Sequence, residues 1–368
     1  MANACGSRLG ARGRSQTPAF GCGHVPRTLS GLVHETSIMS EFFRSITSSN
    51  GSGGAVLEVA MTAYNLVNLD LLSKSDPFII LFMRDGGALA SKSEDVSMIA
   101  SDGPWRAVGM TETVWDSLEP NWVHKFRFAY VTDFDMRQRI RMDVLDRDSE
   151  SSAVNKHDFI GRAECALSDI VNAPMQKLEI VLSNASGKVQ KRRGTLVLHA
   201  ERVLDKPAHS LTLDVGFRES CILPAKKGFF FTVSRTTLSG DFCRVYLSGV
   251  VVRPQQENDS DLLFQSADLR DSELFMDDPA RLIRFELFRK DKSGRGAHEQ
   301  LLYFQMSAAE LEALRAGDAV NVRMPAKTKS LQRGSVQVGN ASWNVDTRGG
   351  GLLSLRFADF CWSRGLFS

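Results

Sequence analysis

Five aspartates in two short segments are the residues of this chain best suited to chemistry. They are Asp70 and Asp76 in the first segment and Asp146, Asp148 and Asp158 in the second. Each segment follows a strand-like run, V-L-E-V-A at 56–60 and I-R-M-D-V at 140–144. If one β-sandwich brings both segments to the same end, the five carboxylates share a small space and repel each other. Two like charges about 4 Å apart cost about 4 kcal/mol at an effective dielectric constant of about 20.

A hard divalent cation removes this repulsion, and calcium suits the ligands best. Calcium accepts about six to eight oxygen ligands in irregular geometry, as loop carboxylates and backbone carbonyls provide. Magnesium requires stricter geometry and retains waters, so it fits less well. The alternative is that these are ordinary turn residues, because aspartate favours turns. Five of them at these positions favour the calcium site.

The segment from Ala55 to Arg202 resembles a C2 domain, a β-sandwich that binds phospholipids in response to calcium. The resemblance rests on S-K-S-D-P-F at 73–78, N-W-V-H-K-F at 121–126 and K-H-D-F-I-G at 156–161. Among C2 proteins the chain is most similar to copines. The similar stretches are W-R-A-V-G-M-T-E-T-V-W at 105–115, H-K-F-R-F at 124–128 and R-G-T-L-V-L-H-A-E at 193–201.

The resemblance implies a role for each aspartate and a fold for the whole chain. Asp76, Asp146 and Asp148 would be central calcium ligands, Asp70 would bridge, and Asp158 would complete the site. The expected fold is all-β, with two tandem eight-stranded antiparallel C2 β-sandwiches after a disordered N-terminal tail. The expected parts are a tail and linker at 1–54, a calcium-binding C2 domain at 55–206, a degenerate C2 domain at 207–340, and a stub at 341–368.

The stub resembles the first strand of a von Willebrand factor A-type domain, with the rest of that domain lacking. Asp359 and Ser363 match the ends of its D-x-S-x-S motif, but Cys361 replaces the middle residue, so no metal site is expected there. A truncated copine, a splice form and an incomplete gene model all explain such a stub. The start residue is likewise open between Met1 and Met39.

The second domain repeats the pattern of the first with basic residues in place of acids. Lys226 and Lys227 stand in its first loop and Arg289 stands at a ligand position in its third loop. Calcium binding is therefore not expected there. Two interpretations stay open: a structural spacer, or basic loops that contact anionic lipid without calcium, where each cation contributes about 1 kcal/mol.

Two further groups of residues are candidates for lipid contact in the first domain. Leu71 and Leu72 are expected at the tip of the first loop, where they either insert into a membrane or pack inside the sandwich. The basic candidates for phosphoinositide head groups are Lys125 and Arg127 on a strand and Lys191, Arg192 and Arg193 in a turn. The alternative for the basic residues is an ordinary solvated face.

Composition and missing motifs exclude several classes of function. The 368 residues carry a net charge of +2, are 43% hydrophobic, and contain six cysteines without metal-ligand spacing, which predicts free thiols in a reducing cytosol. No G-x-S-x-G, G-x-x-x-x-G-K or H-E-x-x-H motif occurs, so no enzyme is expected. A nucleic-acid partner is not expected either.

The expected function is a calcium-dependent phospholipid-binding membrane adaptor in trafficking or signalling. It would move from the cytoplasm to the plasma membrane or internal membranes by binding phosphatidylserine or phosphoinositide. The alternative is a calcium-independent protein-interaction scaffold, with vestigial acidic loops and partners bound through the second domain.

Overall fold

The computed structural model describes most of the chain after residue 54. The described residues are 55–84, 103–130, 138–149, 154–204, 210–217, 227–252, 262–265, 267–276, 278–291, 298–314, 319–322, 334–342 and 351–358. The predictions made for 1–54, Lys226 and Asp359 lie outside these residues.

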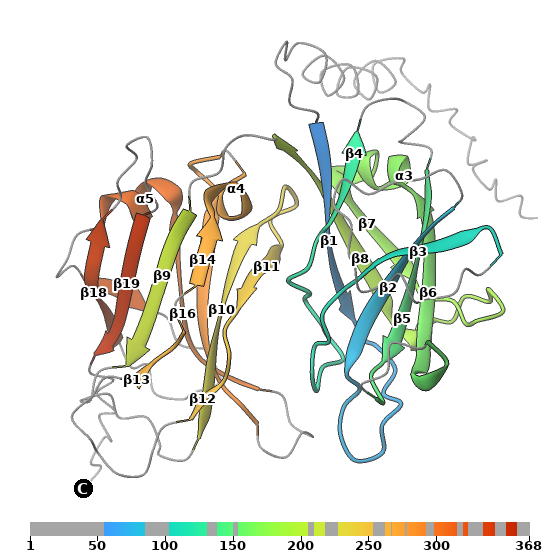
Figure 1. The fold of residues 1–368 in the computed structure, drawn as a ribbon, viewed down its shortest axis with the longest axis horizontal. Coiled ribbons are helices and arrows are strands. Elements are labelled where there is room, and N and C mark those ends of the chain that lie inside the picture. Colours follow the sequence, from blue (N-terminus) through green and yellow to red (C-terminus); the bar gives the residue numbers. More distant parts are fainter. Residues whose placement is uncertain are drawn as a thin grey trace, which may run out of the picture. The chain divides into compact units, whose positions relative to one another are not determined.

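The first sandwich consists of eight strands in two antiparallel sheets, as expected (Figure 1). One sheet has the order β4-β1-β8-β7 and the other has the order β3-β2-β5-β6. The strands are β1 (Ala55–Tyr64), β2 (Pro77–Arg84), β3 (Trp105–Met110), β4 (Phe126–Tyr130), β5 (Arg139–Asp146), β6 (Asp158–Ala166), β7 (Lys177–Val181) and β8 (Thr195–Leu204). Its short helices are η2 (Val154–Lys156), α3 (Leu167–Val171), η3 (Pro174–Gln176) and η4 (Lys191–Arg193).

Two residues of the recognised motifs fix the core of this sandwich. Trp122 is fully buried, and its indole N–H donates to the Pro77 carbonyl at 3.2 Å, which ties the chain before β4 to the start of β2. Gly161 on β6 lies so close to a neighbouring segment that an added Cβ would be 2.8 Å from the Leu182 Cβ. The K-H-D-F-I-G motif therefore ends in glycine because no side chain fits there.

The second sandwich repeats this plan with additional strand segments. One sheet has the order β11-β10-β15-β16, with β12 beside β10, and the other has the order β13-β9-β19-β18-β17, with β14 beside β9. The strands are β9 (Ser210–Phe217), β10 (Gly228–Thr236), β11 (Phe242–Leu247), β12 (Val251–Val252), β13 (Leu262–Leu263), β14 (Ala267–Arg270), β15 (Leu282–Arg289), β16 (Glu299–Ser307), β17 (Ala319–Val322), β18 (Gly334–Ser342) and β19 (Gly351–Ala358). Its helices are α4 (Asp271–Leu274) and α5 (Ala308–Ala313), the latter capped by the Ser307 hydroxyl, which accepts from the Glu310 N–H at 3.2 Å.

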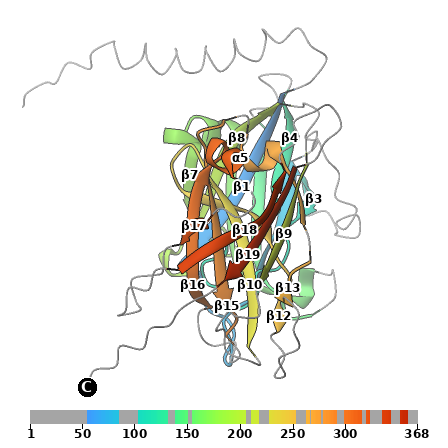
Figure 2. The same cartoon turned by 90° about the vertical axis from the view of Figure 1, so that its left-hand side faces the viewer.

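The described part of the segment expected to form a separate stub belongs to a sheet of the second sandwich. Strand β19 lies between β18 and β9, antiparallel to β18 and parallel to β9 (Figure 2). In the first sandwich the corresponding first and last strands, β1 and β8, pair directly. The expected boundary at residue 340 is therefore wrong for this structure, because the apolar G-L-L-S-L-R-F-A run completes the sheet instead of leaving it.

Buried charged side chains join the two sandwiches. Glu58 of β1 and Arg235 of β10 are each 1% exposed, and Glu58 Oε1 lies 2.7 Å from Arg235 Nη2. Arg281 pairs with Glu201 of β8 at 2.8 Å. Burial raises the pKa of Glu58, but Arg235 and two neighbouring cations outweigh it and hold the pKa at about 2. Removing one member of such a buried pair costs about 3–5 kcal/mol, because its partner is left uncompensated.

Candidate functional site

The first acidic loop, residues 66–76, is held in shape by Asn68. The Asn68 amide donates to the carbonyls of Asp70 and Ser73 at 3.1 and 3.0 Å, and its oxygen accepts from the Ser75 N–H at 2.9 Å. The Ser73 hydroxyl donates to Asp70 Oδ2 at 2.7 Å. These bonds position Asp70 and leave the loop tip outside the sandwich. Asn68 was not among the predicted site residues, although asparagine in a turn typically bonds the backbone two residues on, as Asn68 does to Asp70.

Asp76 and Asp146 meet where β2 begins and β5 ends. Strand pairing places Pro77 opposite Asp146, and the Asp76 N–H donates to Asp146 Oδ1 at 2.6 Å. The Arg147 N–H donates back to the Asp76 carbonyl at 3.1 Å. The ladder between β2 and β5 therefore brings the two acidic segments to one end of the sandwich.

Asp148 and Asp158 flank the third loop. Asp158 lies opposite Asp146 in the β5–β6 register, and its N–H donates to Asp148 Oδ2 at 2.7 Å. The Asp148 N–H points to His157 Nδ1 at 3.4 Å, and the His157 ring packs edge-on against Phe78 with centroids 5.1 Å apart. His157 thus connects the third loop to the core residue Phe78, a role that was not predicted for it.

A sixth acid, Asp116, lies beside the cluster and was not predicted. Its N–H donates to Asp76 Oδ1 at 2.6 Å, and its backbone has a φ of 54°. The next residue, Ser117, donates its N–H to the Ser75 carbonyl at 3.0 Å. The loop between β3 and β4 therefore docks against the first acidic loop. Asp116 follows Trp115 in the copine-like stretch, where a turn-forming acid was the available signal.

The carboxylates repel each other in the folded protein. Burial raises the pKa of Asp76 to about 6, and the negative charges of Asp116, Asp146 and Asp70 add to the shift. Burial also raises the pKa of Asp146, again with like-charge contributions from Asp70 and Asp148. All five predicted aspartates except Asp158 are thus linked by these electrostatic effects, and Asp158 joins through its bond to Asp148.

The donor set fits a hard cation in chemistry, while the side chains as placed do not surround one. Asp146 Oδ2 is buried without a hydrogen-bond partner, which is the state of an oxygen that a cation would satisfy. In the described part of the chain, however, no three carboxylate, imidazole or thiol groups gather closely enough to hold a metal ion. The carboxylates instead accept backbone N–H groups. The structure therefore supplies the oxygens and the excess negative charge, and calcium coordination stays a prediction.

The predicted membrane-contacting leucines lie at the tip of the first loop. Leu71 is 99% exposed and Leu72 is 71% exposed. The alternative that both pack inside the sandwich does not hold. Insertion of either residue into a membrane stays a prediction.

The structure gives several of the basic candidates protein partners. Arg127 pairs with Glu58 at 2.8 Å, and Lys125 Nζ donates to the Arg244 carbonyl at 2.6 Å. The Arg193 guanidinium donates to the Ile160 carbonyl at 2.5 Å, while Arg192 is exposed. Lys191 begins η4, and the structure does not describe its side chain. Lipid binding by these five residues stays untested, and Arg192 is the best placed of them.

The corresponding end of the second sandwich has the same backbone with different charges. The Lys290 N–H donates to the Gly228 carbonyl at 2.8 Å, as Arg147 does to Asp76, so Gly228 replaces Asp76. Arg289 pairs with Glu299 in the β15–β16 register where Asp146 lies opposite Asp158, and the two side chains form an ion pair.

The histidine below the third loop is also repeated. His298 packs edge-on against Phe230 with centroids 5.1 Å apart, and its Nδ1 faces the Asp291 N–H at 3.3 Å. This matches His157, Phe78 and Asp148 of the first sandwich. Among the described residues, the second site therefore differs from the first most clearly by glycine at the position of Asp76 and arginine at the position of Asp146.

Comparison with known proteins agrees with this geometry. Residues 56–181 match the C2 domain family model. The first sandwich is thus similar in sequence to C2 domains from β1 to β7. Protein BONZAI 1 of Arabidopsis thaliana is 28% identical over 284 residues, which cover 73% of this chain and 44% of that protein. This match is longer than the first sandwich.

Two other similarities are lower either in coverage or in identity. Nicotinic receptor-associated protein 1 of Caenorhabditis elegans is 29% identical over 168 residues, which cover 43% of this chain and 26% of that protein. The chain therefore spans less than half the length of these curated relatives. The structure of Extended-Synaptotagmin 2, C2A- and C2B-domains, is 11% identical and covers 86% of this chain and 94% of that one, with a TM-score of 0.28. No helix in the described ranges is long and apolar enough to cross a bilayer.

Proposed function

We propose that this chain is a calcium-dependent phospholipid-binding adaptor that reaches anionic membranes through its first C2 domain. The observation that carries this proposal is the cluster of repelling, partly buried carboxylates at the loop end of that domain, with the pKa of Asp76 raised to about 6. In a folded protein with such repulsion, a cation bound at that position is favoured because it compensates the clustered negative charges. Sequence similarity to C2 domains supports the same class of function.

In this proposal each of the five aspartates has a role in calcium coordination. Asp76, Asp146 and Asp148 would hold the ion, with Asp70 bridging and Asp158 completing the set. Calcium would supply positive charge and open coordination positions for phosphate oxygens of phosphatidylserine or phosphoinositide. With the negative potential cancelled, Leu71 and Leu72 could enter the membrane, and burying one leucine contributes about 1.5–3 kcal/mol.

The proposal includes where the protein acts and what it does not do. We propose that it moves from the cytoplasm to the plasma membrane or to internal membranes when calcium rises. We also propose that it is not an enzyme. Protein partners of the second sandwich are part of the proposal as well, since one relative is named for association with a nicotinic receptor.

Co-sedimentation of the full chain with phosphatidylserine vesicles tests this function. The wild-type chain should pellet with calcium and stay in solution with chelator. Asp146→Asn combined with Asp148→Asn should lose the calcium-dependent fraction, because both substitutions keep shape and remove charge. Glu164→Gln with Asp268→Asn removes two exposed charges elsewhere and should behave as wild type. Vesicle binding that is independent of calcium and unchanged by Asp146→Asn with Asp148→Asn would contradict the proposal.

A second candidate function is a calcium-independent scaffold. The observation that favours it is the Arg289–Glu299 ion pair, which gives the second sandwich a permanent positive charge at the position of a metal ligand. In the vesicle experiment this candidate predicts no binding under either condition.

A further inference from the structure

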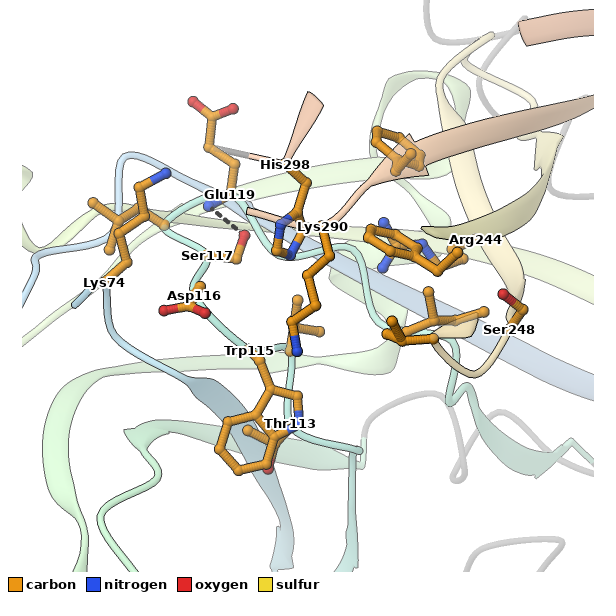
Figure 3. A pocket seen from close by; sticks show the side chains of 16 residues that line it. Lys74, Thr113, Trp115, Asp116, Ser117, Glu119, Arg244, Ser248, Lys290 and His298 are labelled. Carbon is orange, nitrogen blue, oxygen red and sulfur yellow. Dashed lines mark hydrogen bonds between the residues drawn. The ribbon is translucent and has the colours of Figure 1, made fainter. Parts of the chain in front are cut away.

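A cavity of about 630 Å³ lies between the first and the second sandwich, outside the aspartate cluster (Figure 3). On one side it is lined by the β3–β4 loop, which includes Trp115 and Asp116, and by Lys74 of the first acidic loop. On the other side it is lined by residues of β10, β11, β15 and the start of the third loop of the second sandwich, among them Arg244 and Lys290.

Arg244 is the residue of this cavity that needs an explanation. Its Nε is buried without a hydrogen-bond partner, and no carboxylate in the described ranges forms an ion pair with its guanidinium. Burial lowers the pKa of Arg244, and the negative charges of Glu286 and Glu112 offset this only in part. Its backbone is fixed: its N–H donates to the Asn121 side chain at 2.8 Å and its carbonyl accepts from Lys125. A buried guanidinium N–H without an acceptor is costly, and an anion beside the guanidinium would compensate the charge of the half-buried side chain.

Two further cations border the same space. Lys290 is exposed and extends from the second sandwich toward Trp115 (Figure 3), and Lys74 lies on the opposite side. Both are close enough to His298 to lower its pKa, although burial is the larger cause. Against these three cations the lining holds two acids, Asp116 and Glu119, so the cavity has an excess of positive charge.

The remaining walls are aromatic. The Phe230 and Phe288 rings are stacked, with centroids 5.1 Å apart and planes at 10°. Trp115 is 54% exposed and lines the same cavity. Aromatic walls accept the carbon face of a ring, whereas lysine and arginine accept phosphate oxygens. A cavity that combines the two selects for an anionic ring compound over a simple ion.

We propose that this cavity binds a cyclic organic polyphosphate of the inositol phosphate class, with phosphates on Arg244, Lys290 and Lys74 and the ring against the aromatic walls. The same chemistry is present in a free inositol phosphate and in a phosphoinositide head group. This site differs from the aspartate cluster in charge and in ligand, and it needs no calcium.

Calorimetric titration of the full chain with inositol trisphosphate in the presence of chelator tests the site. The wild-type chain should bind. Arg244→Gln and Lys290→Gln should each weaken binding by roughly ten- to hundredfold, since each removes a charge-assisted hydrogen bond. Lys290 is exposed, so its variant keeps the test valid if Arg244→Gln fails to fold. Arg270→Gln removes an exposed arginine of the same sandwich and should bind as wild type.

A second arm identifies the source of the ligand. The same variants are titrated, again with chelator, with phosphatidylcholine vesicles that do or do not contain phosphatidylinositol bisphosphate. Binding to the soluble compound alone, or to the vesicle-borne head group as well, supports the proposal if both cation variants weaken it. Equal affinity in all variants, no binding in either arm, or tighter binding of adenosine triphosphate than of inositol trisphosphate would overturn it.

Discussion

At the scale of single residues, the acidic end of the first sandwich is organised by backbone N–H groups. Asp146, Asp76 and Asp148 each accept an N–H bond, from Asp76, Asp116 and Asp158 respectively, at 2.6–2.7 Å. Each bond fixes one oxygen and compensates part of its charge, while the other oxygen stays available. The arrangement is consistent with carboxylates whose remaining oxygens are positioned to bind a cation.

Asp76→Asn should change stability in opposite directions with and without calcium. The pKa of Asp76 is raised from 3.8 to about 6, so the folded state binds a proton more tightly than the unfolded state. The free energy of unfolding of the calcium-free protein should therefore fall as pH rises from about 4 to about 6. Asparagine carries no charge and retains the oxygen that accepts from Asp116, so the variant should lack this loss.

Thermal unfolding measured with chelator checks this prediction. The variant should melt above wild type near neutral pH, and the difference should disappear at about pH 4. Excess calcium should reverse the order, because only the wild-type folded state gains binding free energy. A variant that melts below wild type at every pH in chelator would contradict the account.

At the scale of elements, strand register explains what could be predicted from sequence and what could not. The strand-like runs at 56–60 and 140–144 predicted β1 and β5, and the motif aspartates follow the strands as expected. The bracing by Asn68, the docking of Asp116 and the support by His157 depend on contacts between loops, which strand periodicity does not encode. The repeat in the second sandwich was visible, with Arg289 at a ligand position, and the register with Glu299 shows that this position is that of Asp146.

Strand β19 is the element that sequence analysis misplaced. Its apolar run resembles the opening strand of another domain, and that local pattern is the same whether the strand starts a new sheet or completes an existing one. The pairing with β9 and β18 decides the matter, and that pairing is non-local.

The first-loop tip carries the prediction at this scale. Leu71→Ser with Leu72→Ser should weaken calcium-dependent vesicle binding by about 100-fold or more if both side chains enter the membrane, since each contributes about 1.5–3 kcal/mol. Calcium affinity measured without vesicles should not change, because neither leucine supplies a charged ligand. Met175→Ser removes an exposed apolar side chain from a different turn and serves as the control. Vesicle binding equal to wild type in the double variant would exclude insertion.

At the scale of the whole molecule, the two sandwiches share a backbone plan and differ in how they balance charge. The first leaves its carboxylates to repel, whereas the second replaces one of them by Arg289 and pairs it with Glu299. A bound cation would therefore relieve repulsion in the first sandwich, whereas the second sandwich already has the Arg289 guanidinium at the equivalent position. The Glu58–Arg235 pair joins the two sandwiches, so the acidic end of the first sandwich and the cavity beside it belong to one connected unit.

Calorimetric titration of the full chain with calcium, comparing wild type with Asp146→Asn and Glu299→Gln, tests whether the acidic end of the first sandwich binds calcium. The account predicts that wild type binds calcium, that Asp146→Asn loses this binding, and that Glu299→Gln retains it because the second sandwich takes no calcium. Calcium binding that survives Asp146→Asn, or that disappears in Glu299→Gln, would contradict it.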